Sequence, residues 1–305
     1  MANPINRSSY ASDLLPIVRK WESDQLKKHD PLTPKICTEE SSDSAYEVYG
    51  VSSGMGAMQE KGEGENIQYD SNRQMYTPRF THTAYALGAK ITMEALQDAK
   101  AMKHAKRIGI QLARAEYETR DILTANLIND AFTSGVTQDG GDGSILIVTT
   151  HPSQVGNQSN AIASNADLSE ASLETMFIQI RKAKDERGLR ANINPVKLVI
   201  PVDLLPEAER ILGSDKRVNV ADNDLNYIKD SGMFPGGIVS SPYFTDTDQF
   251  VILTDVPDGL MALNRYSSGV ETDNVFDSKN ACFSKIIRTS RGWVNWRAVY
   301  GSPGV

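Results

Sequence analysis

The longest helical pattern of apolar and polar positions in the chain runs from Thr92 to Ser134. It holds no proline and a single glycine, Gly109, among many strong helix formers. Apolar residues recur through it at helical spacing, namely Ile108, Leu112, Ala115, Ile122, Leu123, Leu127, Ile128 and Phe132. Such a helix would be about 60 Å long, whereas a compact chain of this size is about 50 Å across. The pattern therefore predicts an elongated molecule built on a spine helix, with Gly109 as the first place to look for a bend.

Residues 1–44 have the pattern of an arm. Five apolar residues allow one short amphipathic helix: Leu14, Leu15, Ile17, Val18 and Trp21. Pro31 and Pro34 then favour extended backbone, and few apolar residues remain. We expect this arm to be tied down on a neighbouring surface. A frayed terminus is the alternative interpretation.

Residues 45–90 predict an extended loop, a long β-hairpin standing away from the body. Strand-like stretches flank a glycine-rich segment, residues 50–65, which has little to bury. A lone hairpin is marginally stable in water, so this loop needs a neighbour from the same chain or from another copy.

The pattern in the rest of the chain predicts two domains. Because helices and strands occur in both, the predicted fold class is α+β. Residues 91–166 would form a peripheral domain with the spine helix, completed by a β-element from residues 258–305 that turns back at Ser290–Gly292. Residues 167–257 alternate helices and strands, which indicates a small α/β domain. Its expected elements are a helix capped by Asp167 or Ser169 and ended by Gly188, a strand at Pro195–Pro201, a helix at Leu204–Leu212, and strands at Ile238–Val239 and Phe250–Thr254.

Composition excludes several classes of protein. Hydrophobic residues make up 40% and charged residues 23%, which is ordinary for a folded chain. No apolar run approaches the roughly 18 residues of a membrane span, and the first residues do not resemble a secretory signal. A formal net charge of −7 argues against a dominant nucleic-acid-binding surface. The two cysteines, Cys37 and Cys282, are expected to be reduced and structural.

The sequence contains no convincing motif for catalysis, for cofactor binding or for metal binding. Ser52 lies in a Gly50–Gly54 match to the serine-hydrolase nucleophile elbow, but Gly54-Met-Gly56 is a poor start for the helix that must follow, so a hydrolase is a remote alternative. Residues 222–233 fail the calcium-loop pattern, and the four histidines and two cysteines show no zinc spacing. Neither a Walker loop nor a dinucleotide-binding glycine motif is present. We therefore expect no enzyme activity and no cofactor.

Basic residues cover the first half of the spine helix: Lys100, Lys103, His104, Lys106, Arg107 and Arg114. Acidic residues follow at Glu116, Glu118 and Asp121. The ordinary interpretation is a solvated face with intrahelical ion pairs. The alternative is a contact face toward an acidic partner or subunit.

Several blocks, in order and with their spacing, resemble a known family over about Tyr46 to Gly304. They are Glu63–Glu65 with Tyr69–Asp70, Thr83–Gly88, Leu112–Arg114, Asn126–Phe132, Pro195–Pro201, Asp248–Leu253 and Arg291–Arg297. Together they are similar to the major capsid proteins of tailed bacteriophages, which share the Hong Kong ninety-seven phage capsid fold. The resemblance implies an N-terminal arm, an extended loop, a peripheral domain with a spine helix, and an axial domain.

The same resemblance implies assembly into hexamers and pentamers of an icosahedral head around double-stranded DNA. It further implies a portal, room for a decoration protein, and assembly in the cytoplasm of a bacterial host. Some members begin with a long helical scaffolding segment, for which this arm is too short, so a separate scaffolding protein is expected. The acidic charge balance predicts only weak nonspecific contact with DNA. Some members crosslink a loop lysine to a neighbour's asparagine, but Lys61 alone does not predict that chemistry here. An encapsulin-like shell around a protein cargo uses the same fold and is the main alternative.

The loop is expected to lie across an adjacent subunit and add strand hydrogen bonds to it. The arm is expected to clasp another neighbour, and the basic half of the spine helix adds a contact face under the alternative interpretation above. The candidate inter-subunit residues are Trp21, Val51, Met55, Met58, Lys61, Glu63, Glu65, Lys103, Arg107 and Arg114.

Overall fold

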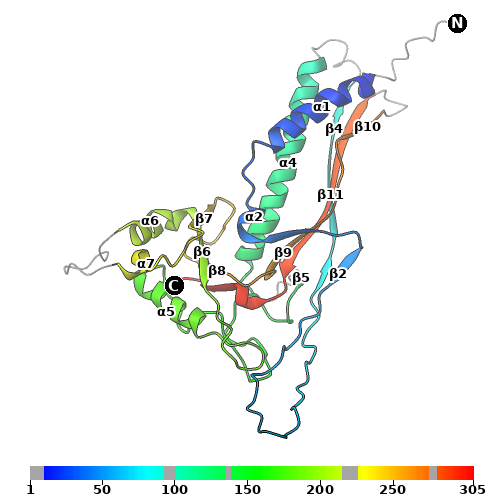
Figure 1. Cartoon of the computed structure of the whole chain (residues 1–305). Coiled ribbons are helices and arrows are strands. Elements are labelled where there is room, and N and C mark those ends of the chain that lie inside the picture. The colour runs from blue at the N-terminus through cyan, green and yellow to red at the C-terminus, as the bar shows by residue number, and fades with distance from the viewer. Residues whose placement is uncertain (1–9, 93–100, 135–138, 215–225, 275–279) are drawn as a thin grey trace, which may run out of the picture.

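The computed structural model describes residues 10–92, 101–134, 139–214, 226–274 and 280–305. Figure 1 shows an elongated molecule in which the spine helix α4 runs beside a long sheet. A smaller lobe with helices α5, α6 and α7 lies to one side, and an extended loop projects from the end opposite the start of α4. The predicted elongated α+β architecture is what the chain adopts.

Helix α4 spans Ala101–Asn129, 29 residues, and is about 44 Å long. The predicted earlier start, at residues 93–100, and the glycine cap at 135 lie outside the described residues. The helix is not broken at Gly109, because α4 is continuous through this position. A Cβ on Gly109 would lie 2.5 Å from the backbone oxygen of Val18. The glycine is therefore a point of close approach between two helices.

Helix α1, Tyr10–Leu26, is longer than the pattern predicts and packs along α4 (Figure 1). Leu14 and Val18 are buried with Ile108 and Leu112 in one apolar cluster. A short helix α2, Thr33–Ile36, and strand β1, Thr38–Ser41, follow, and β1 pairs in parallel with β9, Leu260–Ser267. The apolar face expected to hold a neighbour is thus covered by the same chain.

The peripheral sheet is organised around strand β11, Ala281–Trp293. It pairs antiparallel with β4, Thr83–Ile91, with β9 and with β10, Glu271–Asn274, and in parallel with β5, Asp139–Gly140. The predicted turn at Ser290–Gly292 is wrong, since β11 runs straight through it. A Cβ on Gly292 would lie 2.0 Å from the Asp139 carbonyl oxygen, so this glycine too serves close approach.

The axial lobe contains a four-stranded sheet in the order β12–β8–β6–β7. Strands β6 (Pro195–Pro201) and β8 (Phe250–Thr254) match the prediction, as does the Ser169 cap of helix α5, although α5 ends at Arg181, well before Gly188. The other elements are η2 (Val202–Leu204), α6 (Leu205–Gly213), α7 (Tyr227–Asp230) and β7 (Ile238–Ser241). After η3 (Trp296–Ala298), the last strand β12 (Val299–Ser302) pairs with β8. The end of the chain therefore belongs to the axial sheet, whereas the sequence placed it in the peripheral domain.

The extended loop is a regular hairpin only at its base. Strand β2, Tyr46–Val48, pairs antiparallel with β3, Arg79–Thr81, and one isolated bridge joins Ser52 to Gln74. Residues 53–73 then run without regular strand structure.

Candidate assembly surfaces

The extended loop presents large apolar side chains to solvent. Their exposed fractions are 69% for Met55, 103% for Met58, 66% for Ile67 and 95% for Tyr69. Single exposed apolar residues are ordinary, but a group of them on one projecting segment marks an interaction surface. Val51 has a different role: its N–H donates to Tyr76 and its carbonyl accepts from Met75, so it fixes the base of the loop.

Charged residues occupy the tip of the same loop. Lys61, Glu63 and Glu65 are all exposed. The Glu65 carboxylate accepts a hydrogen bond from the Gly62 N–H at 3.0 Å, which closes the turn at the tip. The structure thus brings six sequence-predicted residues, from Val51 to Glu65, onto one projection.

The Asp70 carboxylate joins three segments of the chain. In the sequence, Asp70 was named only within a block that resembles the family, and no contact was predicted for it. Asp70 Oδ2 accepts from the Gly56 N–H at 2.7 Å, and Oδ1 accepts from the Ser71 N–H and from Arg187 Nη2, both at 2.8 Å. Arg187 Nη1 also donates to the Ser71 carbonyl at 3.1 Å. The Gly56 hydrogen bond and then the Arg187 guanidinium hold the pKa of Asp70 below its usual range. We call this set of contacts the loop clip.

The basic residues of the spine do not join the loop surface. Lys103, Arg107 and Arg114 are exposed, and their spacing places them on one face of α4, away from the buried Ile108 and Leu112. Figure 1 shows the first turn of α4 at the far end of the molecule from the loop. Arg114 forms the i,i+4 ion pair with Glu118, at 2.7 Å, that the ordinary interpretation predicts.

Trp21 faces the spine of its own chain. The Lys106 ammonium lies 3.7 Å from the centre of the Trp21 ring, a cation–π contact between α1 and α4. This candidate contact residue therefore takes part in holding α1 on α4.

Beneath α1 lies a buried ionic centre that sequence patterns gave no reason to expect. Lys285 of β11 forms ion pairs with Glu22 of α1 and Glu116 of α4, and Arg120 holds Glu116 at 2.9 Å. Burial alone would raise the pKa of Glu116, but Lys285 first and then Arg120 outweigh it, and the pKa is lowered. The centre thus joins three elements through charges removed from water.

Comparison with known proteins identifies the family. A family model described as phage capsid protein matches residues 76–302, most of the chain. The chain belongs to the phage capsid protein family. Comparison with curated protein sequences finds no match.

Solved structures show the fold of this capsid protein. The bacteriophage JBD30 capsid is 14% identical with a TM-score of 0.55, over 71% of this chain and 92% of that one. The capsid of a native GTA particle is also 14% identical with a TM-score of 0.55, over 88% of both chains. A virus-like particle from Pyrococcus furiosus is 12% identical with a TM-score of 0.51, over 94% and 98%. The predicted family and the phage capsid fold are confirmed, and the encapsulin-like alternative is not favoured.

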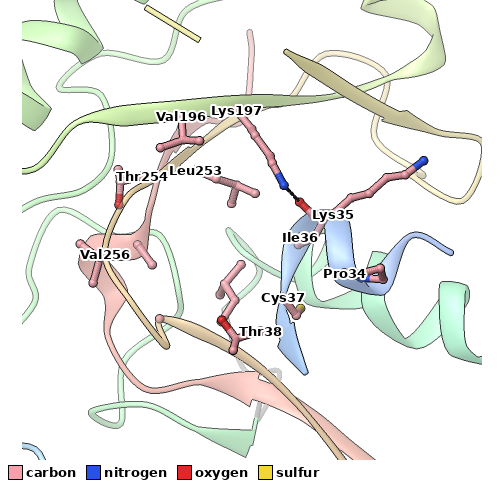
Figure 2. Close-up of a pocket in the computed structure, with 13 residues that line it drawn as sticks. Pro34, Lys35, Ile36, Cys37, Thr38, Val196, Lys197, Leu253, Thr254 and Val256 are labelled. Carbon is pink, nitrogen blue, oxygen red and sulfur yellow. Dashed lines mark hydrogen bonds between the residues drawn. The ribbon is translucent and has the colours of Figure 1, made fainter. Parts of the chain in front are cut away.

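The capsid protein has a cavity of about 200 Å³ where the arm segment meets the axial lobe (Figure 2). Residues of α2 and β1 line one side and residues of β6 and β8 the other, and Lys197 Nζ donates to the Lys35 carbonyl at 2.7 Å across it. Cys37 lies at its wall, and burial raises the pKa of this thiol to about 12. Both cysteines are free, and at Cys37 the high pKa disfavours the reactive thiolate.

The capsid protein does not build the hydrolase geometry. Ser52 sits in the bridge to Gln74, and the described residues that follow it, through Thr92, contain no helix. Within the described ranges, no group of three His, Cys, Asp or Glu side chains could hold a metal ion. The helices of those same ranges are also too short or too polar to cross a membrane.

Proposed function

We propose that copies of this capsid protein form the hexamers and pentamers of an icosahedral phage head, in which each extended loop lies across an adjacent copy. The observation that carries this proposal is the exposure of Met58 and Tyr69 on a projection that its own chain leaves uncovered. Burying such a side chain contributes about 1.5–3 kcal/mol, so an adjacent copy that covers both gains a substantial contact. Repetition around a closed shell makes modest contacts cooperative.

The test replaces residues 57–69, beyond the loop clip, by a short Gly-Ser linker. We expect the variant to unfold at the same temperature as the wild type and to remain in small species by size-exclusion chromatography and electron microscopy. The wild type should give icosahedral particles or rings of five and six under the same conditions. Particles formed equally well without residues 57–69 would contradict the role given to the loop.

We further propose that the shell encloses double-stranded DNA without gripping it, and that a separate scaffolding protein, a portal and a decoration protein are its other partners in the host cytoplasm. The net charge of −7 supports weak contact with DNA, because tight nonspecific binding needs a basic surface. Purified subunits should therefore show weak affinity for duplex DNA. A tight affinity that falls steeply with salt would overturn this part of the proposal.

A further inference from the structure

The loop clip is the place where the extended loop meets its own axial lobe. Gly56 lies on the outgoing segment of the loop and Asp70 on the returning one, while Arg187 comes from the axial lobe. Each oxygen of one carboxylate is used, so the two segments and the lobe are held at a single point. A Cβ on Gly56 would lie 3.3 Å from Asp70 Oδ2 and 3.4 Å from Arg187 Nη2, which shows how closely the backbone approaches.

Arg187 is presented from a well-fixed turn. The Asp185 carboxylate accepts hydrogen bonds from the N–H groups of Arg187 and Leu189, at 2.9 and 2.8 Å. The next residue toward the N-terminus, Glu186, is buried and bonded to Arg297 at 2.7 Å. These contacts hold the backbone from which the Arg187 side chain extends. The Arg187 guanidinium can therefore hold the loop in a fixed position relative to the axial lobe.

Beyond the clip the loop carries the side chains that would reach another copy. Met58 and Tyr69 lie on this distal part, two residues from Gly56 and one from Asp70 respectively. The clip lies nearer to these side chains than the paired strands β2 and β3, the Ser52–Gln74 bridge and the hydrogen bond from the Ser53 N–H to the Arg73 carbonyl, which fix the base of the loop.

We propose that Arg187, acting through Asp70, is the positioning residue that sets the direction in which the extended loop leaves the subunit. The inference rests on the proposed function, in which that loop docks on an adjacent copy. A loop that swings about its base must lose this freedom when it docks, and a loop already held in the docking direction loses less.

The test compares Arg187→Ala with Arg190→Ala in the full chain. Arg190 is a matched control, because its guanidinium donates to the Lys182 carbonyl of its own turn and stays off the loop. Two quantities are measured: hydrogen exchange of the Gly56 amide in dilute unassembled subunits, and the protein concentration at which particles form. For Arg187→Ala we expect exchange about twofold to fivefold faster and a similar rise in that concentration, the range for an exposed ion pair. Arg190→Ala should change neither quantity.

Arg187→Lys serves as a second variant, since it keeps the charge and loses the two-pronged geometry. It should give values between those of the wild type and Arg187→Ala, with thermal unfolding unchanged in all three. Gly56 exchange or particle formation in Arg187→Ala equal to that of Arg190→Ala would overturn the inference. Normal particles without residues 57–69 would instead overturn the proposed function, so the two failures are distinguishable.

Discussion

The interface between α1 and α4, which we call the seam, is buried within the subunit, whereas the extended loop is exposed to solvent. In the seam, Val18 is completely buried, Gly109 lets the two helices approach closely, and Lys285 joins both helices to the sheet. In the loop, Met58 and Tyr69 are almost fully exposed. The Asp70–Arg187 ion pair, which holds the loop to the axial lobe, lies at the surface.

This difference in burial suggests separate roles for the two regions, one in folding of the subunit and one in the proposed assembly. The seam satisfies its apolar and charged groups within one chain, so it stabilises the subunit. The loop leaves apolar groups exposed to water, and in the proposed function a neighbouring copy covers them. Substitutions in the seam should therefore unfold the subunit, and substitutions in the loop should leave a folded subunit that assembles poorly.

Removing the cation of the buried centre should have the largest effect. Lys285→Met leaves Glu22 and Glu116 facing each other without their shared partner. Breaking a buried ion pair on one side typically costs about 3–5 kcal/mol. Urea unfolding of the subunit should show a loss of that size. Lys90→Met, at an exposed lysine on the neighbouring strand β4, is the control and should change stability by less than about 0.5 kcal/mol. Equal losses would show that the seam does not depend on the buried charge.

Gly109→Ala should have the next largest effect. In an exposed helix this change stabilises by about 1 kcal/mol, but here the new methyl group meets the Val18 backbone. Overpacking of this kind costs typically about 1–3 kcal/mol, so we expect net destabilisation measured by thermal unfolding. Gly213→Ala in α6, where a Cβ meets nothing within 4 Å, should be neutral or mildly stabilising. A stabilised Gly109→Ala variant would mean that the two helices can separate at no cost.

Acid should weaken the seam through Glu116. Because the folded-state pKa of this carboxyl lies below its usual value, its charge stabilises the fold above the unfolded-state pKa and that contribution is lost as pH falls through the folded-state pKa. Stability measured between pH 6 and pH 3 should therefore decline toward the acid end. Glu116→Gln should be less stable at pH 6 and show a shallower decline. The same slope in both proteins would assign the acid sensitivity to other groups, among them Asp142, whose pKa is lowered by His151 against the effect of burial.

Two glycines show where sequence patterns stop being informative. Periodicity located the spine helix and the strand β11, because both depend on local spacing of apolar residues. Gly109 and Gly292 were interpreted as a bend and a turn, yet each allows a distant backbone to approach, Val18 in one case and Asp139 in the other. A local pattern cannot reveal such a partner, since the approach exists only in the tertiary structure.

The candidate surfaces divide in the same way. The exposed residues of the loop were predictable, because a glycine-rich segment with little to bury has to project. The partners Asp70 and Arg187 are far apart in the chain, and each looks like an ordinary surface charge. Lys285 was equally hidden, because it occupies a core-facing position of an alternating strand, where the pattern favours an apolar residue.

The smallest change in stability should come from the loop, and it is the sharpest test of the comparison. Met58→Ser removes an apolar side chain that solvent already surrounds, so the free energy of unfolding of the isolated subunit should change by less than about 0.5 kcal/mol. The concentration needed to form particles should rise about tenfold, because losing an apolar contact of 1–2 kcal/mol in each copy changes an association constant by that factor. Ile178→Ser on α5, an exposed apolar residue away from the loop, is the matched control and should alter neither quantity. If Met58→Ser destabilised the isolated subunit as much as Gly109→Ala does, the loop would belong to the fold of its own chain, and the separation between folding and assembly would fail.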